Sequence, residues 1–126
     1  MKKAGRSLAL LWLGLTLAGC AAIAPVPEGS QPIGTYQGLM WGGIEGPIQV
    51  TLFQTPKGDI VFSGQYVDSS NGGVGHFRGT VLGNAMEGKI DFALGDISGQ
   101  LSADNSQMSG SLKFAQYHST WSATLQ

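Results

Sequence analysis

Residues 97–112 read Ile-Ser-Gly-Gln-Leu-Ser-Ala-Asp-Asn-Ser-Gln-Met-Ser-Gly-Ser-Leu. One five-residue pattern occurs twice in this stretch: an apolar residue, any residue, glycine, any residue and a second apolar residue. The two copies flank a polar reversal at 104–107. Because side chains alternate between the two faces of a strand, each glycine shares a face with its apolar neighbours. The stretch therefore predicts two antiparallel strands joined by a turn.

The same pattern recurs four times upstream, centred on Gly38, Gly64, Gly79 and Gly88. From Gly79 to Gly110, successive pattern glycines are 9, 11 and 11 residues apart, which is the length of a strand plus a tight turn. Such uniform spacing indicates an antiparallel meander. We find no helical periodicity after residue 33 and predict eight strands, at 34–42, 47–55, 59–67, 74–83, 85–94, 96–103, 108–114 and 119–125.

The fold class expected from this pattern is all-β, a small eight-stranded antiparallel meander barrel, with a two-sheet β-sandwich as the alternative. Glycine inside a strand marks a bend or a close approach of two backbones, and a small closed sheet needs such bends. The glycine face is predicted to point inward and the opposite, polar face outward. A narrow interior must then hold several aromatic side chains: Phe62, Phe77, Phe92, Phe114 and Trp121.

The layout is similar to the avidin-type up-and-down β-barrels found among exported bacterial proteins. The similarity rests on the strand from Phe62 to Tyr66, on the meander and on a closing strand that contains Trp121. It implies the barrel fold only. Biotin binding is not carried over, because no matching set of polar ligand contacts can be identified and a fold alone does not give a function.

The chain begins with a pattern typical of a secretory signal peptide, predicted at residues 1–19. Lys2, Lys3 and Arg6 precede an apolar run at 8–17, and small residues follow up to Cys20. The run is shorter than the roughly 20 residues that a membrane-spanning helix needs.

Leu17-Ala18-Gly19-Cys20 resembles the lipobox of bacterial lipoproteins. The resemblance implies a diacylglycerol on the thiol of Cys20, cleavage just before it and acylation of the new N-terminus, for example by palmitate. In Gram-negative members of that family, Ala21 after the cysteine would imply sorting to the outer membrane, on its periplasmic side. Two alternatives stay open: a signal peptide cut elsewhere, and an uncleaved helix at 8–24.

Residues 20–33 are predicted to form a proline-rich, extended tether, and 34–126 the barrel domain. Cleavage before Cys20 leaves 107 of the 126 residues, with four basic and eight acidic side chains and a net charge of −4 if the N-terminus is acylated. This charge argues against a nucleic-acid partner and against electrostatic binding to anionic lipid. Because Cys20 is the only cysteine, the chain cannot form an internal disulfide.

The sequence contains no recognisable catalytic, metal or cofactor motif, so we expect a protein that is not an enzyme and carries no cofactor. His76 and His118 are expected at the surface, and the loop at 68–73 lacks the ligand ladder of a calcium site. Trp41 and Tyr117, both near strand ends, are the candidates for a ligand or partner surface. The expected function is a membrane-anchored accessory module that binds an envelope protein; the alternative is a barrel that binds a small molecule or lipid in a cavity left by its glycines.

Overall fold

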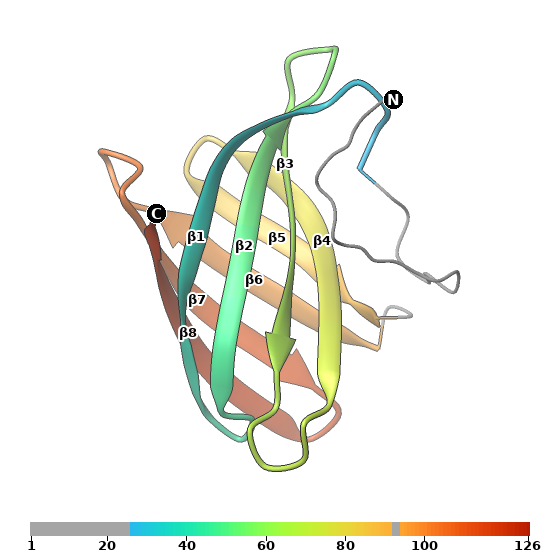
Figure 1. Cartoon of the computed structure of the whole chain (residues 1–126), viewed down its shortest axis with the longest axis vertical. Coiled ribbons are helices and arrows are strands. Elements are labelled where there is room, and N and C mark those ends of the chain that lie inside the picture. Colours follow the sequence, from blue (N-terminus) through green and yellow to red (C-terminus); the bar gives the residue numbers. More distant parts are fainter. Residues whose placement is uncertain (1–25, 92–93) are drawn as a thin grey trace.

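The computed structural model describes residues 26–91 and 94–126 of the chain, so the predicted signal peptide, Cys20 and Phe92 lie outside the described residues. Eight strands follow one another: β1 (Gln31–Gly42), β2 (Gly46–Gln54), β3 (Ile60–Val67), β4 (Val74–Leu82), β5 (Ala85–Ile90), β6 (Gly95–Leu101), β7 (Gln107–Phe114) and β8 (Tyr117–Leu125). Each pairs antiparallel with the next, and β8 pairs with β1 to close the barrel (Figure 1). The predicted meander barrel is confirmed, and the sandwich is ruled out.

The first strand begins earlier than the sequence suggested. Gln31 and Pro32 pair with Gln54 and Phe53, and the register then skips Ile33 as a bulge. A proline is tolerated at the start of a strand or at a bulge, where its missing N–H breaks no ladder bond. Residues 31–33, predicted as part of the tether, therefore belong to the barrel.

The strands form two walls and two ends. In Figure 1, β1–β4 make the near wall and β5–β8 the far wall. The N-terminal end of the barrel carries the start of β1, the end of β8 and the β2–β3, β4–β5 and β6–β7 turns. The opposite end, here called the distal end, carries the other four connections.

The short turns follow the chemistry of their residues. In the β2–β3 turn, the N–H of Gly58 donates to the carbonyl of Thr55 at 2.8 Å, and Gly58 has a φ of +92°. A glycine in the left-handed region is typical of such short hairpin turns. The two-residue β4–β5 turn likewise has Gly83 at a φ of +64°.

The core is built from aromatic rings that lie against glycines of the neighbouring strand. Phe62 on β3 pairs with Gly79 on β4, and Gly64 on β3 pairs with Phe77 on β4. A Cβ atom at Gly79 would lie 2.6 Å from Cζ of Phe62, and one at Gly64 would lie 2.7 Å from Cζ of Phe77. The two rings are 0% and 1% exposed, with centroids 6.1 Å apart. The glycines thus provide the space that the rings occupy.

Trp121 on β8 repeats this arrangement on the far wall. It pairs with Gly110, and a Cβ at Gly99 would lie 2.8 Å from its Cζ2. The indole is fully buried, and its Nε1–H is shared between the carbonyl oxygens of Ser98 at 3.2 Å and Ser111 at 3.3 Å. A buried indole needs such a partner for its polar group. The prediction that Phe62, Phe77 and Trp121 interleave in the interior is confirmed, and Phe114 is partly buried against the same core.

We expect Gly79→Ala to lower the free energy of unfolding by about 2–3 kcal/mol, because the added methyl would overlap Phe62 and the β5 backbone in a filled interior. The matched control is Gly34→Ala, where the nearest atoms, at 3.2 and 3.3 Å, belong to the side chains of Leu125 and Tyr36. We expect the control to change stability by less than about 1 kcal/mol. Urea unfolding followed by circular dichroism measures both. Equal effects of the two substitutions would contradict this account of the core.

Candidate functional site

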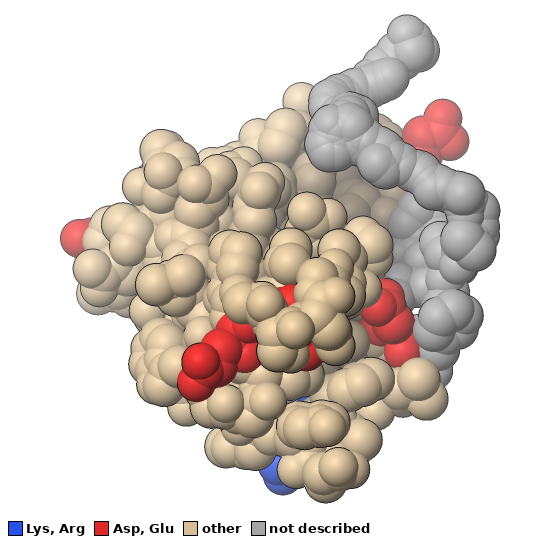
Figure 2. Space-filling model, turned by 60° about the horizontal axis from the view of Figure 1, so that its bottom comes forward, with Lys and Arg blue, Asp and Glu red and all other residues tan. Residues whose placement is uncertain are grey.

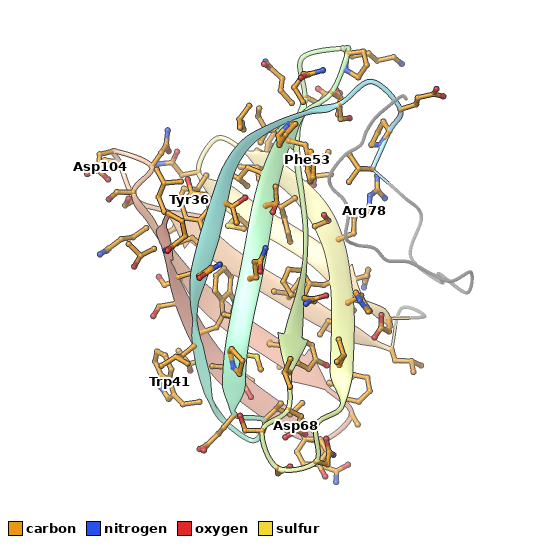
Figure 3. The ribbon with its side chains drawn as sticks, viewed as in Figure 1. Tyr36, Trp41, Phe53, Asp68, Arg78 and Asp104 are labelled. Carbon is orange, nitrogen blue, oxygen red and sulfur yellow. The ribbon has the colours of Figure 1, made fainter. Side chains whose placement is uncertain are left out.

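The N-terminal end of the barrel is closed by Tyr36. Its side chain is 2% exposed, and its hydroxyl donates a 2.6 Å hydrogen bond to the carbonyl of Asn105 in the β6–β7 turn. Burial raises the pKa of Tyr36, and the nearby charge of Asp104 raises it further. Tyr36 and Asp104 are seen near the same end in Figure 3. The turn and the tyrosine together cover this end of the interior.

Asp104 holds the β6–β7 turn in place. One of its carboxylate oxygens accepts hydrogen bonds from the hydroxyl of Ser106 at 2.7 Å, the hydroxyl of Ser102 at 2.8 Å and the backbone N–H of Ser106 at 3.0 Å. These bonds, led by the one from the Ser106 hydroxyl, lower the pKa of Asp104 to about 2, because they stabilise the charged form. Asn105 then adopts a φ of +61°, which asparagine tolerates better than most residues.

The distal end is closed by Ile44 in the β1–β2 connection. Ser119 on β8, 1% exposed, holds it from both sides: its hydroxyl accepts from the N–H of Ile44 and donates to the carbonyl of Ile44, both at 2.8 Å. Ile44 is 6% exposed and belongs to the core cluster. Buried backbone groups need hydrogen-bond partners. Ser119 supplies them for the N–H and the carbonyl of Ile44, so Ile44 can be buried at this end of the barrel.

A cluster of buried side chains occupies the described interior. Two hollows stand out among the described residues, and both open to solvent. One, of about 530 Å³, lies between Pro27 and the adjoining ends of β3 and β4; the other, of about 250 Å³, lies over β6–β8. Neither is lined by Phe62, Phe77 or Trp121. Of the two sequence interpretations of the inward glycines, space for rings and space for a ligand, the structure supports the first.

The two residues predicted as a surface site lie at the same end of the barrel. Trp41 is near the end of β1 and Tyr117 opens β8, the strand that pairs with β1. They are 49% and 44% exposed. Trp41 lies on the outer face, since Met40 beside it is buried, and it projects away from the barrel in Figure 3. Both are thus available at the distal end.

The outer face differs between the two walls, which corrects the prediction that it is polar throughout. On β5–β8 the outward positions are polar or charged apart from Ala85. On β1–β4, apolar side chains lie on the outer face at both ends of the strands, with polar residues such as Gln49 and Gln65 between them. At the distal end this apolar set comprises Leu39, Trp41, Pro47, Val67 and Val74. Of these, the sequence analysis singled out only Trp41.

Acidic side chains border this apolar set. Glu45 is exposed in the β1–β2 connection, and its carbonyl accepts from the N–H of Ser69, next to Asp68. Asp91 accepts a hydrogen bond from the backbone N–H of His76 at 3.0 Å. Burial raises the pKa of Tyr66, and the charges of Asp91 and Asp68 raise it further. Figure 2, which brings the distal end forward, shows acidic side chains gathered there.

The remaining predicted positions have structural or surface roles. His76 has a side chain that is 60% exposed and lies 3.9 Å from Asp91, and His118 is exposed as predicted. Asp68 accepts from the N–H and hydroxyl of Ser70, which organises its own loop. Within residues 26–91 and 94–126, His, Cys, Asp and Glu side chains form no group of three that could hold a metal ion. No helix in these residues is long and apolar enough to cross a membrane.

No protein-family model matches the chain, and none of the curated proteins matches it in sequence.

Removing the charge of Asp104 should make the stability of the folded chain depend less on pH in the acid range. Because its pKa falls from 3.8 to about 2 on folding, the carboxylate stabilises the fold above its unfolded pKa, and that contribution disappears as the pH falls through 2. We expect Asp104→Asn to be less stable than the native chain at neutral pH. This difference in stability between the two chains should narrow between about pH 4 and pH 2. Thermal melts across this range measure the gap. A gap that stays constant with pH would contradict the assigned role of Asp104.

Proposed function

We propose that the protein is a lipid-anchored lipoprotein of the bacterial envelope, without catalytic activity, whose barrel binds a protein partner. The observation that carries this proposal is the motif Leu17-Ala18-Gly19-Cys20, preceded by basic residues and an apolar run. One acyl chain gives only marginal membrane binding, at about 0.8 kcal/mol for each buried CH₂ group, while two or more chains hold stably. A multiply acylated Cys20 would keep the domain at the membrane, on the outer membrane and facing the periplasm in a Gram-negative host.

The geometry of the barrel supports partner binding more than ligand binding. Its described interior is occupied by buried side chains, and Tyr36 and Ile44 cover its two ends. A barrel that holds a small molecule or lipid needs interior volume and an opening. Exposed apolar residues instead lie outside, and one set of them lies at the distal end of β1–β4. Exposed apolar patches of this kind are typical of interaction sites.

Acylation can be tested by replacing Cys20. We expect the native chain, expressed in a bacterium fed an alkyne-tagged palmitate, to take up the label and to sediment with membranes. Cys20→Ser should take up no label and leave the membrane fraction, because the thiol that carries the diacylglycerol is gone. The matched control is Ser30→Cys in the Cys20→Ser chain, which restores a thiol outside the motif and should restore neither property. Labelling of the Cys20→Ser chain would contradict the proposed anchor.

A further inference from the structure

One apolar surface of the described residues is the set at the distal end, here called the distal band: Leu39, Trp41, Pro47 and Val74, which are exposed, and Val67, which is half-buried. Leu39, Trp41 and Val74 are 61%, 49% and 51% exposed, and Pro47 is also exposed. These fractions are high for side chains of this size and type. None of the band residues belongs to the core cluster, so packing of the core does not explain why they are apolar.

The register joins the band into one surface across four strands. Leu39 on β1 pairs with Pro47 on β2. Ile48 pairs with Tyr66, which sets Pro47 beside Val67 on β3, and Val67 pairs with Val74 on β4. With neighbouring strands about 4.8 Å apart, the row from β1 to β4 spans about 15 Å. Trp41, two residues beyond Leu39 on the same face, extends it toward the end of the barrel.

The charged side chains in the connections at the distal end are acidic. Glu45, Asp68 and Asp91 lie in the connections at the distal end. The four basic residues that follow Cys20 lie outside the band: Lys57 in the turn at the N-terminal end, Arg78 in the middle of β4, and Lys89 and Lys113 near the distal ends of β5 and β7 on the far wall. Lys89 is also paired with Asp96 at 2.6 Å. A partner segment seated on the band would therefore meet the carboxylates of Glu45 and Asp68 at its edge.

We propose that the distal band docks a partner protein through a segment that combines apolar side chains with lysine or arginine. The apolar surface of the band would be removed from water, and the acidic border would select the charge of the partner. A second copy of this chain would bring the same acidic border and be repelled, and so would an anionic lipid surface. The proposal rests on the proposed function and names the surface and the partner chemistry that it requires.

The position of the band also suits a membrane-anchored protein. β1 runs from the N-terminal end, where the segment after Cys20 joins the barrel, to Trp41 at the distal end. Twelve residues at about 3.3 Å each, tilted as in small barrels, place the band about 30 Å from the entry of the chain. The segment that would carry the lipid thus joins the barrel at the end opposite to the band.

The test is site-specific photo-crosslinking in the full chain, in the envelope of its own host. A benzophenone amino acid is placed at band positions 41, 47 or 74, and at positions 100, 109 or 122 on the outer face of β6–β8, which is exposed and polar. The proposal expects protein adducts from the band positions only. Mass spectrometry of the adduct should identify a partner peptide with Lys or Arg close to apolar residues.

Matched substitutions test the chemistry of the contact. Leu39→Ala and Leu82→Ala remove the same atoms from exposed positions, one in the band and one at the C-terminal end of β4, which lies at the N-terminal end of the barrel. We expect Leu39→Ala to reduce the adduct from position 47 about tenfold and Leu82→Ala to leave it unchanged. Glu45→Gln and added salt should each reduce the adduct, because both weaken the attraction between opposite charges.

Several outcomes would overturn the proposal. Adducts from the far wall alone, or equally from both walls, would contradict the claim that the distal band is the docking surface. They would leave a partner-binding function in place. Band adducts with lipid, with a second copy of the chain or with an acidic peptide would contradict the proposed partner chemistry. If Leu39→Ala and Leu82→Ala reduced the adduct from position 47 equally, the partner contact would not be located at the band. If all six positions gave no protein adduct, the proposed partner-binding function would fail together with this inference.

Discussion

The structure depends on the contact between an aromatic ring and a glycine on the adjacent strand. An eight-stranded barrel has an interior just wide enough to be filled by side chains. Phe62 and Phe77 fit into it because each lies against a glycine of the strand that carries the other. Trp121 does the same with Gly110 and Gly99. Closure of the sheet, burial of the rings and loss of interior volume all follow from this pairing.

Because the interior is occupied by buried side chains, we look for a binding site on the outside of the barrel. Tyr36 and Ile44, held by Asn105 and Ser119, cover the two ends through hydrogen bonds that leave no described backbone group of Ile44 unpaired. The outer face of β5–β8 is polar, as expected for a surface in water. The outer face of β1–β4 is not, and its distal apolar residues are bordered by carboxylates. The chain enters the barrel at one end, and the proposed docking surface lies at the other.

Much of the fold could be predicted because alternation and glycine spacing are local properties. The six glycine-centred segments predicted the inward face correctly, from Tyr36 to Leu112. The start of β1 was missed because Pro32 is typical of a tether, and only its pairing with Phe53 makes it part of a strand. The distal band was missed, except for Trp41, because its members come from four strands and are joined by register. One signal was present: Leu39, next to Gly38, is an apolar residue at an outward position.

The central claim is that a solid barrel, held at the membrane by lipid, binds a protein on its outside. Native mass spectrometry of the protein gently extracted from its own membrane tests this most directly. The account predicts the 107-residue chain that begins at Cys20, with its lipid, in complex with a second protein. A mass that matches the unprocessed 126-residue chain, or a small molecule retained by a barrel without a protein partner, would contradict it.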